Sequence, residues 1–260
     1  MDITEKWSLV VPLKPLAVAK SRLAGAVGAV RPALALAFAL DTVAAALACE
    51  QVADVTVVTD DATAAAQLAG LGALVAADMP GAGLNAALRY GAERIRERLP
   101  RAPVAALNGD LPALRPAELG SVLSEAVRAH TRAFLADAAG VGTTLLAAPA
   151  GLALAPAFGG PSRARHLASG AREITLPCVP SVRQDVDTAD DLRAARALGL
   201  GPRTAAFFAA DGEPARYEAP GAVRHVPPAP PAPGGGALTE HQVPRPLPGG
   251  TASCAGQGLG

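Results

Sequence analysis

The chain has 260 residues, of which 50% are hydrophobic and 18% are charged, as is usual for a soluble globular protein. Its 23 basic residues balance 23 acidic ones, so no overall field favours binding to nucleic acid or to an anionic membrane. The three cysteines are widely spaced and odd in number, which argues against a disulfide framework or a metal knuckle and favours a cytoplasmic location.

The first half of the sequence alternates between predicted strands and helices. Trp7–Pro12 is a short apolar run, typical of a buried strand. The stretch Pro32–Cys49 is rich in alanine and leucine, and because Asp41 interrupts it, it predicts a buried helix rather than a membrane span. The next expected elements are strands at Val52–Thr59 and Gly72–Ala76 and an amphipathic helix at Gly83–Arg98.

The alternation continues in the second half. Further strands are expected at Val104–Leu107, Ala133–Ala136, Thr143–Ala148 and Glu173–Leu176, and helices at Pro116–His130 and Thr188–Leu198. This order predicts an α/β fold with a mostly parallel sheet covered by helices on both faces. In such sheets the ligand binds at the carboxyl ends of the strands.

The composition changes after residue 210. Between Asp211 and Gly260 there are 10 prolines and 10 glycines in 50 residues, well above the roughly 25–30% that is typical of disordered segments. We therefore expect a folded domain over residues 1–210 and a disordered tail over residues 211–260. An inert extension is favoured over a tail that recruits a partner.

The loop after the first predicted strand carries unusual positive charge. Only three of the 23 basic residues are lysines, and two of them, Lys14 and Lys20, lie in this loop with Ser21 and Arg22. Because a lysine is a compact point charge and the loop follows a buried strand, it is suited to bind a triphosphate. The loop has neither the P-loop nor the Rossmann glycine pattern, and two solvated lysines remain the alternative.

Acidic residues follow two other apolar runs. Asp110 ends the strand at Val104–Leu107, and Asp185 and Asp187 precede the last helix, where on a strand they would point the same way. Neighbouring carboxylates repel one another unless a cation lies between them, and Mg²⁺ is the usual cation beside substrate phosphates. Alternatively, Asp110 is a turn residue, and Asp187 or Thr188 caps the helix; capping and metal binding can coexist.

Three glycine-rich segments remain. Gly140–Thr144 and Phe158–His166 would let the backbone approach a ligand, with hydroxyls and two arginines available for phosphate or carboxylate. Gly81–Asn85 lies at a helix start and could contact a base. Ordinary loop and helix-start roles are equally compatible with these segments. His166 is too isolated for a metal ligand, and no Ser/His/Asp or Cys/His set is apparent.

Six segments in this order resemble the 2-phospholactate and phosphoenolpyruvate guanylyltransferases of deazaflavin coenzyme F-420 biosynthesis: VPLKPLAVAKSRL, GLNAAL, NGDLPAL, GTTLL, FGGPSRARH and DVDTADDL. The resemblance spans about Trp7 to Phe208 and implies the Rossmann-like fold of the nucleotide-diphosphosugar transferases. Ala139 and Val141 depart from the family pattern, in which an acidic residue and Thr or Ser are common. The tail has no counterpart in the family.

The resemblance implies a role for each motif. Lys14, Lys20 and Arg22 would be catalytic, facing the phosphates of GTP. The remaining implied residues are Pro12, Ser21, Gly83 and Asn85 for the nucleotide, Asp110, Asp185 and Asp187 for magnesium, and Thr144, Gly159 and Ser162 for the phosphorylated acid.

The resemblance also implies the reaction. The acid's phosphate would attack the α-phosphorus of GTP and expel pyrophosphate, and because its second pKa is about 6, it needs no general base. Phosphoenolpyruvate is the preferred acceptor, since the composition is typical of a GC-rich bacterium, while 2-phospholactate and 3-phosphoglycerate remain open. The expected partners are GTP, the acid and the next enzyme of the pathway, to which the product would pass.

Two other functions compete with this interpretation. A molybdenum-cofactor guanylyltransferase or a sugar-nucleotide transferase could share the fold, but the first loop lacks their glycine-rich Arg-Met-Gly type of run. A non-catalytic nucleotide-binding domain that uses the tail for a partner is the second alternative. The three carboxylates argue against it, because binding alone would not require them beside a polyphosphate.

Overall fold

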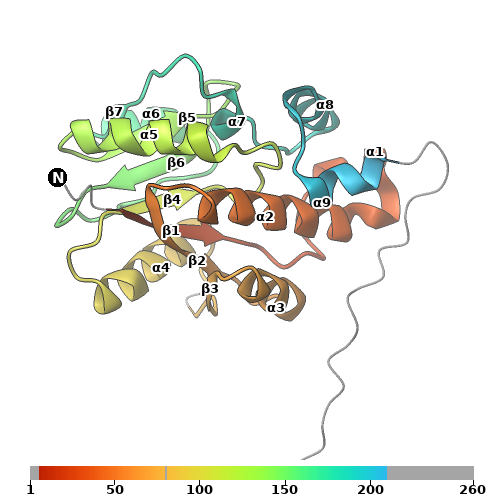
Figure 1. Cartoon of the computed structure of the whole chain (residues 1–260), viewed down its shortest axis with the longest axis horizontal. Coiled ribbons are helices and arrows are strands. Elements are labelled where there is room, and N and C mark those ends of the chain that lie inside the picture. Colours follow the sequence, from red (N-terminus) through yellow and green to blue (C-terminus); the bar gives the residue numbers. More distant parts are fainter. Residues whose placement is uncertain (1–5, 80, 210–260) are drawn as a thin grey trace, which may run out of the picture. The chain divides into compact units, whose positions relative to one another are not determined.

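Figure 1 shows the computed structural model of the chain, which describes residues 6–79 and 81–209. The predicted tail at residues 211–260 lies outside the described residues. The predicted division into a domain of residues 1–210 and a tail therefore stays a prediction.

A mixed sheet forms the centre of the described part of the chain. Its seven strands lie in the order β3-β2-β1-β4-β6-β5-β7. Only β6 runs antiparallel to its two neighbours, which confirms the predicted mostly parallel sheet. The strands are β1 (Trp7–Pro12), β2 (Val52–Val58), β3 (Leu74–Ala76), β4 (Val104–Leu107), β5 (Ala133–Ala136), β6 (Thr143–Ala148) and β7 (Arg172–Glu173).

Helices cover both faces of this sheet. One face packs against α2 (Arg31–Leu47), α5 (Pro116–Arg128) and α7 (Pro180–Arg183), with α3 (Ala62–Gly70) beside the edge strand. The other packs against α4 (Leu84–Arg98), with α6 (Ser162–Ala168) near β7. Figure 1 shows α2 and α5 on one side of the strands and α4 on the other.

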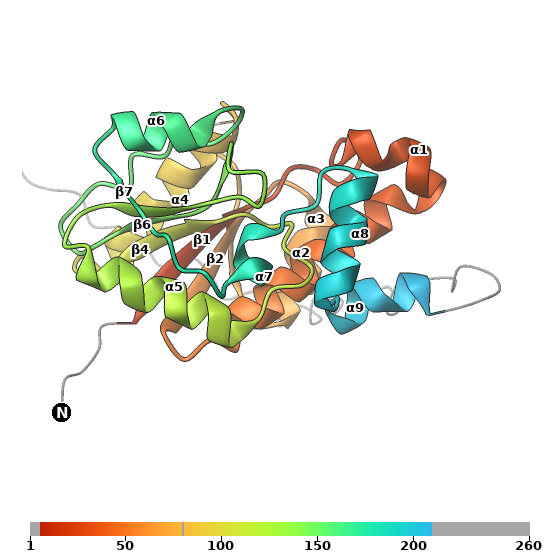
Figure 2. The same cartoon turned by 90° about the horizontal axis from the view of Figure 1, so that it is seen from above.

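A smaller apolar cluster forms at one end of the sheet. It joins Leu34 and Phe38 of α2 to Leu192 of α8 (Ala189–Leu198), and α9 (Pro202–Ala205) packs against it. Figure 2 shows α8 and α9 together beside α1 (Ala24–Val27) at this end. Short 3₁₀ turns at Ser21–Leu23, Gly28–Val30 and Ala206–Phe208 complete the described helical segments.

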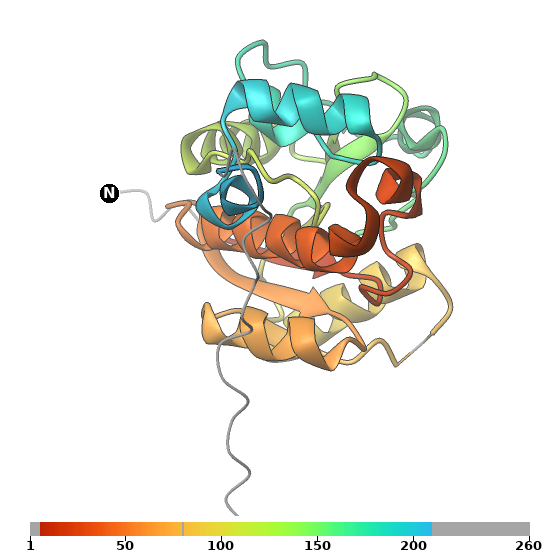
Figure 3. The ribbon, with the colours of Figure 1, turned by 90° about the vertical axis from the view of Figure 1, so that its right-hand side faces the viewer.

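The long apolar helix α2 is part of the core. By length and composition, Ser21–Leu47 could cross a membrane. In the structure, however, every side chain from Leu34 to Val43 is buried, including Asp41, which accepts a backbone hydrogen bond from Thr204 at 2.7 Å. Figure 3 shows α2 enclosed between the strands and the C-terminal helices. The helix is therefore used as a core helix, as its interruption by Asp41 predicts.

The parallel pairing of β1 with β4 sets the position of the site. Val10 lies opposite Ala106, so the segments that follow Pro12 and Leu107 leave the sheet at the same edge. Leu111, just beyond β4, donates its backbone N–H to Thr42 Oγ1 of α2 at 2.9 Å. The loop after β4 is thereby fixed to the helix that covers one face.

Some predicted boundaries were wrong. The strand expected at Glu173–Leu176 is confined to Arg172–Glu173, and beyond it the guanidinium of Arg183 donates to the carbonyls of Ala136 and Ile174 in place of a continued ladder. The helix expected to reach His130 ends at Arg128, and His130 adopts a positive φ of 52°. The glycine-rich segment around residue 160 contains α6, which sequence periodicity did not reveal.

Candidate active site

A cavity of about 620 Å³ opens at the edge where β1 and β4 end. Several segments far apart in the sequence contribute to its wall. The predicted site residues that line it are Pro12, Lys14, Lys20, Ser21, Arg22, Asp110, Gly159, Ser162, Asp185 and Asp187. The structure thus brings the cationic loop, all three predicted metal-binding acids and the glycine segment to one cavity.

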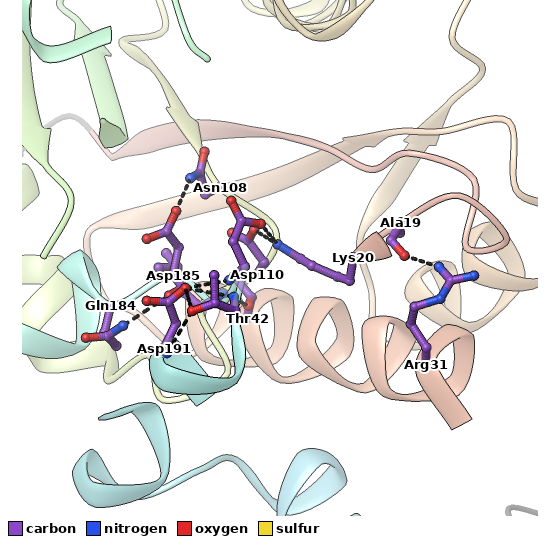
Figure 4. Close-up of polar contacts among 12 residues, drawn as sticks. Ala19, Lys20, Arg31, Thr42, Asn108, Asp110, Gln184, Asp185 and Asp191 are labelled. Carbon is purple, nitrogen blue, oxygen red and sulfur yellow. Dashed lines mark hydrogen bonds and ion pairs between the residues drawn. The ribbon is translucent and has the colours of Figure 1, made fainter. Parts of the chain in front are cut away.

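Lys20 lies between two of the acidic residues that line the cavity. Its ammonium forms ion pairs with Asp110 and with Asp187, the latter at 2.7 Å, as Figure 4 shows for Asp110. Burial lowers the pKa of Lys20, but the two carboxylates outweigh it, so the pKa lies above its ordinary value. Lys20 also adopts a left-handed backbone with φ of 55°, which is rare for a side chain of this kind.

The cationic loop is held by backbone contacts. Leu13 donates its N–H to Val58 O at 2.9 Å, and Leu16 donates to Asp61 Oδ2 at 2.9 Å. Arg31 donates to Ala17 O at 2.7 Å and also to Ala19 O (Figure 4). These contacts leave the exposed side chains of Lys14 and Arg22 with no hydrogen bond or ion pair to another described residue.

The two acidic segments are joined through their backbones. Val186 donates its N–H to Asp110 O at 3.1 Å, which places Asp185 and Asp187 beside Asp110. Asp110 Oδ1 is buried and has no hydrogen-bond partner among the described residues. Asn108 Nδ2 lies 3.5 Å from Asp185 Oδ2 (Figure 4). Asp110, Asp185 and Asp187 thus form a carboxylate cluster. One of its oxygens, Asp110 Oδ1, can accept a hydrogen bond or bind a cation but is not used by any described residue.

The carboxylates of the cluster differ in their pKa. Burial, followed by the charges of Asp110, Asp187 and Asp137, raises the pKa of Asp185 to about 7. Burial also acts to raise the pKa of Asp187, but Lys20 opposes it, with help from Arg22 and Lys14, and the net shift is downward. The structure thus pairs one carboxylate with the loop cations and crowds another among acids.

The segment that carries Asp185 and Asp187 is not a strand, so the same-side orientation that a strand would give this pair does not apply. Thr188 caps α8 and forms a capping box with Asp191, which leaves the side chain of Asp187 available for Lys20. Among the described residues, no group of three His, Cys, Asp or Glu side chains is arranged to hold a metal ion. The Lys20 ammonium lies between two of the three predicted ligands instead.

Three predicted site residues do not line the cavity: Thr144, Gly83 and Asn85. Thr144 is fully buried at an irregularity in the β5–β6 pairing, and its neighbour Thr143 lines the cavity in its place. The backbone of Thr144 accepts a hydrogen bond from Asn108 N at 2.9 Å. Asn85 uses both ends of its amide on the backbone of Phe158.

The two arginines near residue 160 are already engaged within the protein. Arg163 forms a two-pronged ion pair with Glu173 at 2.9 and 3.0 Å. Arg165 donates to backbone carbonyls, that of Ala157 at 3.1 Å and that of Gly159. Their suggested role as ligands for phosphate or carboxylate is therefore not supported by the geometry.

Asp137 lines the cavity but was missed from the sequence. Its carboxylate accepts backbone hydrogen bonds from Val141 at 2.9 Å and from Gly142 at 2.8 Å, so it shapes the Gly140–Thr144 turn. A Cβ atom at Gly142 would overlap Asp137 Oδ2. An acid followed by a glycine pair was the signal that could have identified this turn.

Comparison with known proteins places this chain among nucleotidyltransferases. No family model matches the chain. The chain is 66% identical over 205 residues to phosphoenolpyruvate guanylyltransferase of Streptomyces coelicolor, covering 78% of this chain and 96% of that protein. It is 60% identical to the enzyme of the same name from Thermomonospora curvata, covering 80% of this chain and 91% of that protein.

Solved structures agree on the fold. A Desulfovibrio desulfuricans protein assigned as a nucleotide-diphospho-sugar transferase matches with a TM-score of 0.58 at 16% identity, over 77% of this chain and 93% of that one. A 4-diphosphocytidyl-2C-methyl-D-erythritol synthase matches with a TM-score of 0.53 at 15% identity, over 75% and 99%. The predicted Rossmann-like fold is confirmed.

Proposed function

This chain belongs to the family of phosphoenolpyruvate guanylyltransferases, and on that premise we propose how its cavity works. We propose that it transfers GMP from GTP to the phosphate of phosphoenolpyruvate, releases pyrophosphate, and serves coenzyme F-420 biosynthesis in the cytoplasm. The observation that supports this proposal is the meeting of a cationic loop and a carboxylate cluster on one cavity.

The cationic loop is proposed to hold the triphosphate. Lys14 and Arg22 line the cavity without a hydrogen bond or ion pair to another described residue, and Lys20 lies deeper between the acids. With Pro12 and Ser21, these side chains surround a volume in which several negative charges can be neutralised at once. Phosphoryl transfer depends mainly on such positioning and charge neutralisation, so we assign these residues to GTP.

We propose that the carboxylate cluster binds magnesium, which would have to displace the Lys20 ammonium from Asp110 and Asp187. Asp110 Oδ1 is buried without a partner, and the neighbouring acids raise the pKa of Asp185. Carboxylate oxygens are the protein ligands that Mg²⁺ prefers beside substrate phosphates. Asp110, Asp185 and Asp187 would hold the ion, and when bound it would neutralise charge on the phosphates.

The acceptor is proposed to lie against Gly159 and Ser162. An oxygen of its phosphate attacks the α-phosphorus of GTP, and the bond from that phosphorus to the oxygen bridging the β-phosphate breaks, so that pyrophosphate leaves. The phosphate is already largely ionised at neutral pH and needs no general base. This agrees with a described cavity lining that contains neither His nor Cys.

The test is pyrophosphate release from GTP with phosphoenolpyruvate, 2-phospholactate or 3-phosphoglycerate in separate reactions. We expect release with phosphoenolpyruvate, its loss on chelation, and its recovery with excess magnesium. ATP in place of GTP should give much slower release. Absence of release with all three acids would contradict the proposed reaction and favour a different nucleotidyltransferase or a nucleotide-binding domain without catalysis.

A further inference from the structure

The backbone between Ala157 and Gly160 reaches the cavity without belonging to a helix or strand. Gly159 and Gly160 line the cavity and have positive φ angles of 92° and 45°. Irregular backbone of this kind must find hydrogen bonds outside regular structure. In this segment, which we call the acceptor loop (residues 157–160), side chains supply them.

Asn85 of α4 supplies one of these contacts. Its Oδ1 accepts from Phe158 N at 2.8 Å, and its Nδ2 donates to Phe158 O at 3.1 Å. The amide thus pairs with one residue's backbone much as a neighbouring strand would. Asn85 is the second residue of α4, directly after Leu84, which lines the cavity.

His166 holds the same loop from its own side. Its Nε2 accepts from Ala157 N at 3.0 Å, so the ring proton lies on Nδ1 and is donated to Thr143 Oγ1 at 2.9 Å. Phe158 is 6% exposed and packs edge-on against this ring at 5.2 Å. His166 and Arg165 are near neighbours of the loop in sequence, whereas Asn85 is 73 positions from Phe158.

We propose that Asn85 is a positioning residue for the acceptor, which sets the acceptor loop from α4 and does not read the base of GTP. This inference rests on the proposed function, because it assumes that Gly159 and Ser162 bind the acid. Each polar atom of the Asn85 amide already makes a hydrogen bond to the Phe158 backbone, and Asn85 is not among the residues that line the cavity, so its amide is oriented toward the acceptor loop rather than toward a guanine edge. Shifts of α4 would therefore pass directly to the acceptor subsite.

The test compares Asn85→Ala and the nearly isosteric Asn85→Asp with the native chain. Asn85→Asp keeps an acceptor for Phe158 N but places a second oxygen opposite Phe158 O. We expect the KM for phosphoenolpyruvate to rise about tenfold or more in both variants, the scale for losing one or two hydrogen bonds. Calorimetric binding of GTP should change less than twofold. Arg89→Ala, an exposed site one turn further along α4, is the matched control and should change neither.

A second measurement does not depend on turnover. Hydrogen exchange of the Phe158 amide should be at least tenfold faster in both variants. Asn85→Ala removes the acceptor of Phe158 N, and Asn85→Asp places an oxygen against Phe158 O, which displaces the pair. A GTP affinity that falls while the KM for the acid is unchanged would overturn the proposal in favour of a base contact. Parallel losses of both, or unchanged exchange at Phe158, would also overturn it. An inactive native chain would instead contradict the proposed reaction. The exchange measurement would still test the contact between Asn85 and Phe158.

Discussion

Lys20 Nζ lies 2.7 Å from Asp187 Oδ1, although the two residues are 167 positions apart in the sequence. The same ammonium also contacts Asp110. A single cation thus bridges two acids that come from the segments after β4 and before α8. Since the acids would otherwise repel one another, Lys20 stabilises their approach, and a bound divalent cation would compete with it for the same oxygens.

Replacing Asp187 by Asn tests whether this acid is functional. We expect turnover to fall roughly 100-fold or more, the scale for losing one electrostatic stabiliser. Asn could have replaced Asp as a helix cap, but Thr188 already caps α8. The Asp187 side chain is 55% exposed, so losing its ion pair should change the free energy of unfolding by less than about 1 kcal/mol. Pyrophosphate release and urea denaturation give the two values.

Asp190→Asn is the matched control for this substitution. Asp190 lies in the first turn of the same helix, is 80% exposed, and pairs only with Arg193 among the described residues. We expect its turnover to stay within about twofold of the native value, as for other exposed surface pairs. Equal turnover in the two variants would show that Asp187 is merely one more acid near the helix.

Replacing Gly142 by Ala tests the role of Asp137. The new Cβ would displace the Asp137 carboxylate from the N–H groups of Val141 and Gly142. We expect a loss of about 1–3 kcal/mol in the free energy of unfolding, typical of a crowded site that also loses hydrogen bonds. Urea denaturation would measure this loss, provided that the dependence of the unfolding free energy on urea concentration is the same in both proteins.

Gly25→Ala provides the control for a glycine change that meets no obstacle. Gly25 lies in α1, where a Cβ would meet nothing within 4 Å. Because alanine favours the helix by about 1 kcal/mol over glycine, this variant should be unchanged or slightly more stable. A Gly142→Ala protein as stable as Gly25→Ala would show that the Asp137 turn does not contribute to stability.

The strands of the sheet could be predicted because a strand's apolar pattern is formed by residues that are neighbours in the sequence. The apolar runs at Trp7–Pro12 and Val104–Leu107 correspond to β1 and β4 residue for residue. Their parallel pairing then places Asp110 beside the cationic loop. This position is expected from the sequence, because the carboxyl ends of parallel strands form the ligand-binding edge of such sheets. The antiparallel insertion of β6 between β4 and β5 was not predictable, because the pairing partners of a strand are not encoded in its own period.

The parts of the site that sequence did not reveal depend on single long-range hydrogen bonds. Asn85 looked like a base contact, but its amide pairs with Phe158. Arg31 was not singled out, although it holds the cationic loop through Ala17 O. In each case a common residue type acts through tertiary geometry, which leaves no periodic or spacing signal in the chain.

Deleting Asp211–Gly260 tests the predicted domain boundary. A segment with 20 Pro and Gly among 50 residues is expected to bury little surface, so its loss should cost little. We expect kcat and KM within about twofold of the full chain and a nearly unchanged Tm. Differential scanning calorimetry and pyrophosphate release are the measurements. A large decrease in either would show that residues after 210 pack on the domain or complete the cavity.

His166 gives a pH dependence whose sign follows from its hydrogen bonds. Burial, with help from Arg165 and Arg132, lowers the pKa of His166 to about 4 from its ordinary 6.5. Protonating Nε2 would remove the acceptor of Ala157 N. Between pH 4 and 6.5 the unfolded chain therefore binds more protons than the folded one, and the free energy of unfolding decreases as the pH falls through this range.

The last prediction isolates this effect with His166→Gln, which cannot titrate. The native chain should lose stability relative to the variant as the pH falls from about 6.5 to about 4, with a slope of at most ~1.4 kcal/mol per pH unit, and the difference should level off below pH 4. Urea denaturation at half-unit pH steps measures it, and subtracting the two curves cancels the titration of every other histidine. Parallel curves across this range would mean that the pKa of His166 is ordinary and that protonation leaves its contact with Ala157 intact.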